Sequence, residues 1–487
     1  MGAENRAERA RSPDAPDPAK TEPVPGGGLW SARHRALTVG LVLTITFIAS
    51  EALAVVTIMP VVARDLGGLK LYGWVFSAFM LGNVIGIVAA GRQADRFGPA
   101  RPFLAGLALF GSGLAIAGLA PSMLVLVAGR ALQGIGGGAV PAIAYVSIGR
   151  SLPERLQAQM MAVLSTAWVV PGLVGPAISA AVASLVGWRW VFLGLLPVVG
   201  VTGSMALPAL FRLGKRPAAA GGEPAAGAVH RQSDGLIAAV GAGLMLTGVS
   251  LVAGARDVIA GVALLLIGVA ALGVALRRLL PAGTFIARPG LPTVILSRGL
   301  LTFAFFGADA YVTLTITTVR HHSPALAGVA VTGSTLAWTA GAWIQSRLNA
   351  RWEARRLIGC GVVVILAGIT AMALVLSPAV PVEVGIGAWT VAGLGIGLAY
   401  APMTLLMLRE APQGREGWAA ASLSLADVLG TAIGIGLGGA AVTAATAHGW
   451  PLAAGVGIAF ALAGTGVLGL AFASRRLPLT HAAAGSS

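Results

Sequence analysis

The chain has little of what a soluble enzyme needs. Only 10% of its 487 residues are charged, against 56% that are hydrophobic. The single cysteine, Cys360, lies inside an apolar run, which excludes an intramolecular disulfide and argues against a metal cluster. The six histidines fall in tails, in loops or at the ends of apolar runs, and no nucleophile–base pair is visible. We therefore expect no enzyme, no bound metal and no cofactor.

Long apolar runs fill most of the sequence instead. A mean hydropathy of +0.85 is typical of a polytopic membrane protein. The charged residues behind the net charge of +15 lie between these runs and form no patch on a soluble domain. We therefore expect no nucleic-acid partner. About twenty apolar residues are enough to cross a bilayer. Fourteen such runs lie near residues 36–62, 73–91, 103–120, 122–149, 159–182, 189–211, 236–255, 258–276, 292–319, 325–346, 357–377, 384–407, 418–446 and 451–473.

The fourteen runs divide into six, two and six. A polar linker rich in Ala, Gly and Pro separates the first six from a compact pair, and six more follow. The N-terminal segment has no apolar core, which is typical of a disordered tail and not of a cleavable signal peptide. We predict a disordered cytoplasmic tail (1–35), an N-terminal six-helix bundle (36–211), a cytoplasmic linker (212–235), an inserted transmembrane hairpin (236–276), a C-terminal six-helix bundle (277–473) and a cytoplasmic tail (474–487).

The basic residues set the expected orientation. With a cytoplasmic N-terminus, Arg130 and Arg298 lie within apolar runs and nearly all the other Lys and Arg residues lie in cytoplasmic segments. Because cytoplasmic loops carry the excess of positive charge, both termini are predicted to be cytoplasmic. The scarcity of lysine among the 33 basic residues hints at a GC-rich bacterial genome, so we expect a multi-pass protein of a bacterial inner (plasma) membrane. The outside loops then hold only Arg64, Lys70, Arg189, Arg256 and Arg320.

One acid interrupts the first apolar run. Glu51 lies in the segment Thr44–Pro60, and a charge near the middle of a span costs roughly 2.5–3.5 kcal/mol on insertion scales. Because burial disfavours the ionised form, such a carboxyl group is poised to take up a proton. The plainer interpretation is that a neighbouring polar group neutralises Glu51 and that it serves only helix packing. We favour a functional acid, since ionisable residues within spans mark proton and substrate pathways.

The two six-run halves echo each other. Phe306–Tyr311, in the first run after the compact pair, resembles Ile48–Leu53 and places Asp309 at the depth of the first acid. Gly91–Arg96, which follows the second run, resembles Gly341–Arg347 in the later half. Short matches in the same order indicate an internal repeat. Transporters commonly bind substrate where two such repeats meet.

The loop after the second run carries a specific motif. Its sequence, GRQADRFGPAR, resembles the Gly-x-x-x-Asp-Arg-x-Gly-x-x-Arg signature of the major facilitator superfamily between spans 2 and 3. A glycine at its centre permits a tight turn. In that family the aspartate latches the two halves on the cytoplasmic side, and here its partner would be the helix start near Gly417–Trp418. The resemblance implies a conformational switch built from Gly91, Asp95, Arg96, Gly98 and Arg101.

Three further stretches resemble the fourteen-span drug/proton antiporter branch of that family. The segment Arg130–Gly136 is similar to its Arg-x-x-Gln-Gly element, in which the arginine is tied to proton transfer. A buried arginine also needs an acidic or carbonyl partner. An acid nine residues before Pro60 marks the same branch, although the family usually has Asp there. The antiporter element of span 5 is represented by Pro171, Gly172, Gly175 and Pro176, with Ser179-Ala180 in place of its closing Gly-Gly.

Other residues within the spans are candidates for function without a specific motif. Asp427 lies in the thirteenth run, where the branch more often has an amide, and it is either a second proton site, a substrate ligand or a neutralised packing acid. Aromatic side chains suit the walls of a cavity for a lipophilic substrate, whereas interfacial or lipid-facing positions are the more common role of tryptophan. We assign to the substrate cavity Gln133, Trp168, Tyr311 and Trp338.

Together these features predict an all-α membrane protein with the major facilitator fold: two six-helix bundles plus an inserted two-helix hairpin. The resemblance implies a secondary transporter that exports lipophilic small molecules, cationic ones included, in exchange for protons by alternating access. Such multidrug efflux confers antibiotic resistance. Protons are the coupling ion, and we expect a monomer to function in the bilayer. The proton-coupling residues are predicted to be Glu51, Asp309, Asp427 and Arg130.

Two other functions remain open from the sequence. An exporter of lipids or envelope precursors would have the same fold but would open laterally toward the bilayer. A transport-dead membrane receptor or scaffold would not need several buried acids and a buried arginine. Transport assays distinguish all three.

Overall fold

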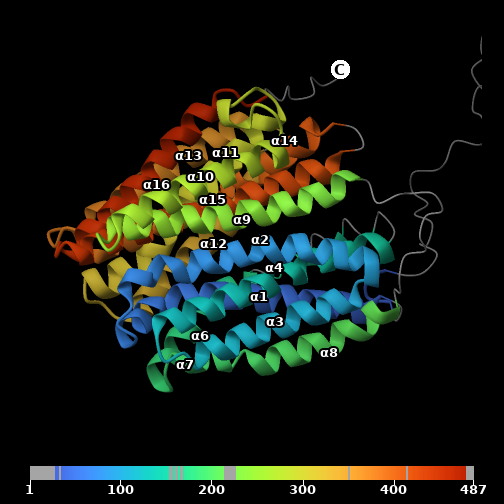
Figure 1. Cartoon of the computed structure of the whole chain (residues 1–487), viewed down its shortest axis with the longest axis horizontal. Coiled ribbons are helices and arrows are strands. Elements are labelled where there is room, and N and C mark those ends of the chain that lie inside the picture. Colours follow the sequence, from blue (N-terminus) through green and yellow to red (C-terminus); the bar gives the residue numbers. More distant parts are fainter. Residues whose placement is uncertain are drawn as a thin grey trace, which may run out of the picture.

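The structure is a computed structural model that describes residues 28–31, 34–152, 156, 159–160, 163–164, 167, 169–212, 226–348, 351–412 and 415–478. Within these ranges every regular element is helical (Figure 1). Thirteen helices are long and apolar enough to cross a membrane, and a shorter apolar helix, Val169–Leu185, accompanies them. The predicted all-α fold with fourteen helices is therefore confirmed. The expected tail 1–35 and linker 212–235 fall largely outside the described residues.

The first half of the chain forms one bundle. Its helices are α1 (Arg35–Asp65), α2 (Tyr72–Phe97), α3 (Ala100–Gly118), α4 (Met123–Ser151), α6 (Val169–Leu185), α7 (Arg189–Leu193) and α8 (Leu196–Arg212), with a 3₁₀ turn, η1, at Leu69–Leu71. The run predicted at 189–211 consists of two pieces, α7 and α8. Pro197 explains the break, because proline lacks an N–H and favours the first turn of a new helix.

The rest of the chain supplies a hairpin and a second bundle. The hairpin is formed by α9 (Ala226–Ala253) and α10 (Val258–Leu279), where Asp257 caps α10 by accepting a hydrogen bond from the N–H of Ala260 at 2.9 Å. A 3₁₀ turn, η2, follows at Thr284–Ile286. The second bundle contains α11 (Leu291–Leu314), the π-helical turn η3 (Thr315–Val319), α12 (Pro324–Leu348), α13 (Ala354–Leu374), α14 (Val382–Glu410), α15 (Glu416–Ala447) and α16 (Leu452–Ser474).

Glycines set the distance between α2 and α4. A Cβ atom on Gly134 would lie 2.1 Å from the backbone oxygen of Phe79, and one on Gly138 would lie 2.1 Å from that of Asn83. Real Cβ atoms essentially never come so close, so only glycine permits this backbone contact. The glycine-rich stretch Gly134–Gly138 therefore serves close helix packing.

The second bundle has the same close contact between a glycine and a backbone oxygen, at corresponding positions. A Cβ on Gly393 of α14 would lie 2.1 Å from the oxygen of Ser334, and one on Gly397 would lie 2.3 Å from that of Trp338. These two glycines stand 259 positions after their counterparts in α4, and the two α12 residues stand 255 positions after theirs in α2. The repeat is therefore defined by packing as well as by sequence, with an offset fixed for each helix pair.

This register corrects one of the predicted echoes. Gly341 contacts α14 in the same way as Gly86 contacts α4. A Cβ on Gly341 would lie 2.5 Å from the oxygen of Leu394, and one on Gly86 would lie 2.0 Å from the oxygen of Ile135. Gly341 therefore corresponds to Gly86, and not to Gly91 as the sequence match had it. The motifs were matched on composition, whereas the helices align on the small residues that contact the next backbone.

The glycine contacts lead to a paired prediction. Gly138→Ala and Gly397→Ala should each destabilise the protein by about 1–3 kcal/mol, because the added methyl group forces the two helices apart. Gly359→Ala, in α13, is the matched control: its Cβ would meet nothing within 4 Å. Alanine there should be neutral or stabilising by up to about 1 kcal/mol. Thermal unfolding in detergent measures all three, and equal melting temperatures would contradict the packing argument.

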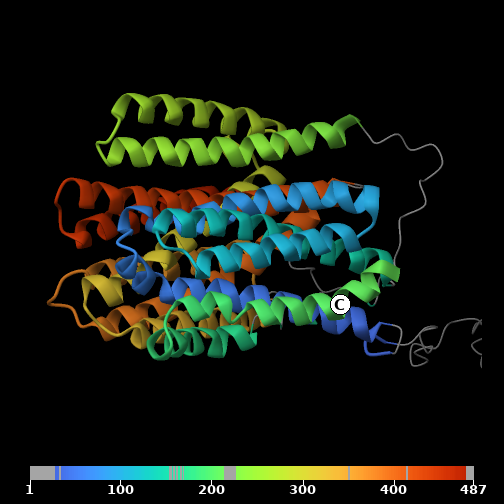
Figure 2. The same cartoon turned by 60° about the horizontal axis from the view of Figure 1, so that its bottom comes forward.

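The hairpin lies over the junction between the two bundles. Figure 2 shows it as an outer layer on one side of the molecule. Its helix α9 packs against both α2 and α15, and the shared apolar cluster includes Leu81, Ala239 and Leu429. A Cβ on Gly436 of α15 would lie 2.6 Å from Leu246, so α9 approaches this helix closely. The hairpin is thus an outer layer that contacts both halves.

The two bundles are joined most firmly at one end, which we call the joined end: the end where α1 finishes at Asp65 and α2 begins at Tyr72. In Figure 1 the helices of the two bundles lie close together at this end and spread apart toward the other. Among the described residues, five side-chain hydrogen bonds link the halves, and all involve the end of α1, the following turn or the start of α2. They join Tyr72 to the oxygens of Ala310 and Thr313, Thr313 to Val56, Ser77 to Ala432 and Thr443 to Lys70, at 2.8–3.4 Å.

Candidate transport site

A buried ion pair lies between α1 and α4. The guanidinium of Arg130 donates to Oε1 of Glu51 and, at 2.7 Å, to Oε1 of Gln133, which lies one turn further along α4. Its Nε also donates to the backbone oxygen of Val75 at 3.3 Å. All three side chains are buried: 0% of Glu51, 2% of Arg130 and 0% of Gln133 is exposed. The expectation that Arg130 has an acidic or carbonyl partner is confirmed, since it has both.

The pair is not fully satisfied. Within the described part of the chain, Oε2 of Glu51 and Nε2 of Gln133 are buried and have no hydrogen-bond partner. An unmet buried polar atom costs about 1–3 kcal/mol, and native proteins keep few of them. One carboxylate oxygen is therefore held by arginine while the other is available to take up a proton or to accept from a ligand.

The equivalent place in the second bundle carries a different pair. Trp389 in α14 stands 259 positions after Arg130, which is the offset of the glycines beside it, and its Nε1 donates to Oδ1 of Asp309 at 2.8 Å. Asp309 stands 258 positions after Glu51. The acid is thus retained, but its partner is a neutral indole N–H and not a guanidinium. When ionised, Asp309 carries a negative charge that its hydrogen-bond partner does not cancel.

Aromatic rings surround this second acid. The indole of Trp389 stacks on Phe305, with ring centroids 5.2 Å apart and planes inclined by 19°. Trp338 contacts Phe305, Phe306 and Tyr400 at centroid distances of 5.8, 6.0 and 5.4 Å. Trp338 is therefore part of an aromatic cluster beside Asp309 rather than a tryptophan that faces lipid. Such faces attract cations as well as apolar groups.

The third acid is engaged within its own bundle. Oδ1 of Asp427 accepts from Nε of Arg298 at 3.2 Å, and Oδ2 accepts from the hydroxyl of Tyr400 at 2.6 Å. Arg298 also donates to the backbone oxygen of Tyr400 at 2.7 Å, and its guanidinium lies over that ring. This triad ties α11, α14 and α15 together. Of the interpretations left open for Asp427, the contacts favour the neutralised packing acid.

The fold, the repeat and the buried pair can now be compared with known proteins. The sequence model described as Major Facilitator Superfamily matches residues 39–308, which is more than half of the chain. The chain belongs to this superfamily. It is therefore a membrane transporter and not an enzyme.

Relatives within the superfamily cover the chain to different extents. A probable multidrug-efflux transporter of Mycobacterium tuberculosis is 29% identical over 481 residues, which are 94% of this chain and 100% of that protein. The multidrug transporter protein MdtP of Bacillus subtilis is 32% identical over 167 residues, 34% of this chain and 31% of that protein.

Solved structures of the superfamily share the fold. The crystal structure of a D-xylose-proton symporter aligns with a TM-score of 0.63 at 15% identity, covering 92% of this chain and 98% of that one. The POT family transporter PepTSo aligns with a TM-score of 0.65 at 14% identity, covering 90% and 98%. At these identities the likeness establishes the fold alone.

The superfamily's loop motif has the expected turn. Gly98 ends α2 with φ +81°, a conformation that other residues rarely adopt, so the predicted tight turn is confirmed. The guanidinium groups of Arg96 and Arg101 lie 5.0 and 5.9 Å from the ring centroid of Phe97. The side chain of Asp95 and the surroundings of Gly417 lie outside what the structure describes, and the latch of Asp95 therefore stays a prediction. Gly91 lies in α2, also without a described side-chain environment.

The span-5 element of the superfamily's antiporter branch lies against the other half. A Cβ on Gly172 would lie 2.3 Å from Thr335 of α12, and one on Gly328 of α12 would lie 3.4 Å from the oxygen of Pro176. Pro171 is buried, and Gly175 lies near Leu53 of α1, 4.0 Å from its added Cβ. The element therefore provides a close helix contact between the bundles.

Three predicted positions have other outcomes. Tyr311, expected in the cavity, is fully buried at the joined end, where its hydroxyl donates to the oxygen of Ile435 at 2.6 Å. Trp168 lies outside the described residues. Cys360 lies inside an apolar run, from which burial would be expected, but its side chain is exposed on α13. An apolar run does not reveal which side of its helix faces outward, so the sequence could not place Cys360.

Trp389, the hydrogen-bond partner of Asp309, was not predicted from the sequence. A signal was present: Trp389 precedes Gly-Leu-Gly-Ile-Gly at 393–397 by the spacing at which Arg130 precedes Gly-Ile-Gly-Gly-Gly at 134–138. The pairing of Arg298 with Asp427 had no comparable signal, because the two lie on different helices 129 residues apart.

Proposed function

We propose that this superfamily member exports lipophilic small molecules, cationic ones included, in exchange for protons. Relatives that are named multidrug transporters support the drug-efflux part of this proposal. The observation that carries it is the buried Glu51, whose one oxygen is held by Arg130 and whose other oxygen has no partner among the described residues. A carboxyl group placed in this way can exchange a proton without losing its position.

The two acids would divide the work. Glu51 takes up and releases the coupling proton, and Arg130 changes between pairing with a carboxylate and contacting a neutral acid. Asp309 faces an aromatic cluster and no guanidinium, so its charge is available to attract a cationic substrate. Protonation at one site and substrate release at the other are then linked through the rocking of the two bundles. No further cofactor is required, and a monomer contains both halves of the site.

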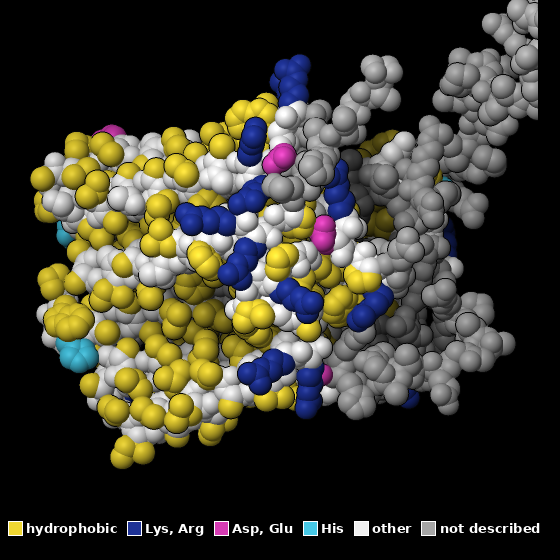
Figure 3. All heavy atoms as spheres, turned by 90° about the horizontal axis from the view of Figure 1, so that it is seen from above, with side chains coloured by type: hydrophobic (Ala, Val, Ile, Leu, Met, Phe, Trp, Pro, Cys, Tyr) yellow, Lys and Arg dark blue, Asp and Glu magenta, His cyan; other side chains and the backbone are white. Residues whose placement is uncertain are grey.

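The orientation is part of the proposal. In Figure 3 the Lys and Arg side chains gather in a band toward one end of the molecule, and the rest of that face is mainly hydrophobic. By the positive-inside rule this end is cytoplasmic, as are both termini, and the joined end faces outside. The protein in this state would be closed to the outside of a bacterial inner membrane. A tag at residue 222 should be reached only from the cytoplasm and one between 256 and 257 only from outside; the reverse would overturn the orientation.

The direct test is transport by purified protein in proteoliposomes. A panel of cationic and neutral lipophilic dyes and antibiotics is loaded, with and without an imposed pH gradient. We expect uphill movement of several cationic compounds only when the gradient is present. Selective movement of compounds with long acyl chains would favour a lipid exporter, and no movement of any probe would favour a receptor or scaffold.

Asp309→Asn should separate substrate recognition from coupling. The variant keeps the hydrogen bond from Trp389 but removes the charge, so KM for cationic substrates should rise roughly tenfold or more. Transport of neutral substrates should change little, and the dependence on the pH gradient should remain. Glu383→Gln, an exposed acid in the first turn of α14, is the control and should leave KM unchanged. An equal loss for neutral and cationic substrates would contradict the assignment.

A further inference from the structure

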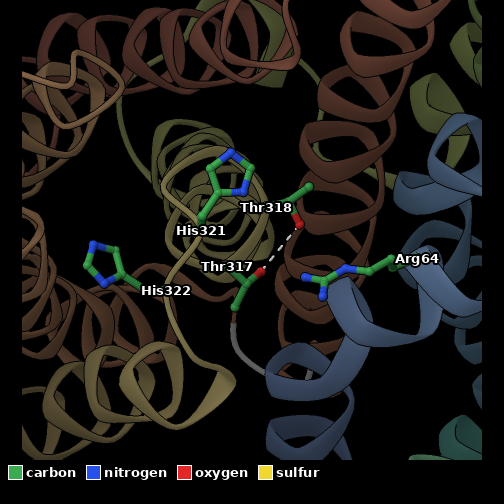
Figure 4. A pocket seen from close by; sticks show the side chains of 5 residues that line it. All are labelled: Arg64, Thr317, Thr318, His321 and His322. Carbon is green, nitrogen blue, oxygen red and sulfur yellow. Dashed lines mark hydrogen bonds between the residues drawn. The ribbon is translucent and has the colours of Figure 1, made fainter.

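A pocket of about 240 Å³ opens at the joined end, between the two halves. It is lined by Arg64 of α1, Thr317 and Thr318 of η3, and His321 and His322 of the following turn. In Figure 4 the guanidinium of Arg64 extends toward the two threonine hydroxyls, His321 lies on their far side, and His322 is further away. Residues from both bundles therefore meet around a small polar space.

The lining contains one arginine and two histidines and includes no carboxylate. The hydroxyl of Thr317 already donates to the backbone oxygen of Thr313 at 2.8 Å. Arg64, His321 and His322 are exposed, and their side chains make no hydrogen bond or ion pair among the described residues. The acid that follows Arg64 is occupied elsewhere: Asp65 accepts from Trp188 at 2.8 Å and from Arg189 at 3.2 Å. Arg64 is thus left without a counterion.

A second arginine at the joined end, Arg320, has its hydrogen bonds satisfied within the protein. Arg320 donates to the backbone oxygens of Val375, Ser377 and Val380 at 2.5–2.7 Å. It therefore caps a turn of the second bundle and does not contribute to the pocket. Arg64, by contrast, has no such acceptor among the described residues and can donate to a ligand in the pocket.

We propose that this pocket binds a phosphate group, either as the free ion or as part of a lipid headgroup. The bound anion holds the two halves together at the joined end. The guanidinium of Arg64 is a donor that phosphate oxygens prefer, the hydroxyl of Thr318 can turn toward the anion, and each imidazole can add an N–H. A volume of about 240 Å³ accommodates a phosphate group with part of its hydration shell, since a water molecule takes about 30 Å³.

The backbone beside the pocket has two unusual features, a π-helical turn and a residue with positive φ. The turn η3 is π-helical, a form that is frequent at functional sites, and it turns Thr317 and Thr318 toward the end of α1. His321 has φ +55°, which is uncommon for a residue with a side chain. Because Arg64 belongs to one bundle and the other lining residues to the second, an anion shared between them favours the joined state and slows its opening.

Phosphate affinity can be measured without any transport. The melting temperature of the full chain in detergent is titrated with sodium phosphate against sodium chloride at constant ionic strength. We expect the wild-type protein to be stabilised with saturation, and Arg64→Gln to raise the apparent Kd roughly tenfold, because a charge-assisted contact is lost. His321→Gln combined with His322→Gln should weaken binding less. Arg256→Gln, which removes an exposed arginine from the hairpin tip at the same end, should change the apparent Kd by less than about twofold.

The source of the phosphate group is decided in nanodiscs. Distances between spin labels at residues 186 and 374, which lie in the two halves near the joined end, are measured in a Cys360→Ala background. If a lipid headgroup is the ligand, phosphatidylglycerol nanodiscs should narrow the distribution relative to the same protein in a phosphate-free maltoside detergent, with no phosphate added to either. If the free ion is the ligand, only inorganic phosphate should do so. The proposal is overturned if neither narrows it, or if Arg64→Gln and Arg256→Gln respond to phosphate alike.

Discussion

Glu51→Gln should abolish efflux driven by a pH gradient and still allow exchange of substrate down its own gradient. Glutamine keeps the size of the side chain and can accept the hydrogen bond from Arg130, so the bundle should fold. It cannot take up a proton, and uphill transport in proteoliposomes should fall to the level of protein-free vesicles. Counterflow of labelled substrate at equal pH should persist.

Two variants sharpen this test. Glu51→Asp provides the residue more usual in the antiporter branch and should retain coupling. The combination with Asp309→Asn distinguishes one proton carrier from two, since partial coupling in each single variant and none in the double variant would mean that the acids share the proton. Wild-type, gradient-driven efflux by Glu51→Gln would refute the central role of Glu51.

Arg130→Met should have the largest effect on stability. It leaves Glu51 as a buried acid without its positive partner, and breaking a buried pair in this way costs about 3–5 kcal/mol. The change should appear as a strong fall in melting temperature and in the yield of monodisperse protein. It also removes the hydrogen bonds to Gln133 and to the oxygen of Val75.

Adding Glu51→Gln to Arg130→Met should recover much of that stability, because the buried charge is then removed from both sides of the pair. The difference between the double variant and the sum of the two single variants measures the coupling. Additive effects would mean that Glu51 and Arg130 do not interact in the folded protein, contrary to their contact.

Much of the fold was predictable because a bilayer restricts the chain to a few solutions. Length and apolarity gave the fourteen helices, and the tight turn at Gly98 followed from the loop motif. The need of a buried Arg130 for an acid was also foreseeable, since an unpaired charge within a span is so costly. These are features that a single segment, or a general physical rule, decides by itself.

What escaped prediction depends on how helices meet. The pairing of Asp309 with Trp389, the triad around Asp427 and the burial of Tyr311 are decided by the rotation and depth of helices that are distant in the sequence. The error of five residues in matching Gly341 has the same cause, because the packing register is set by contacts with α14 and α4.

The position of the hairpin makes the two sides of the transporter unequal toward lipid. Where α2 meets α15, the helix α9 lies over both, so a compound dissolved in the bilayer cannot enter between them there. Where α6 meets α12, exposed apolar side chains such as Leu173, Ile178 and Leu336 border the other contact between the halves. Helix α1 packs against both α6 and α12, whereas the hairpin helices α9 and α10 lie against α2 and α15. We expect lateral entry of a hydrophobic molecule to be confined to the side of α6 and α12. An even number of added helices would then preserve the topology and make access from the membrane one-sided.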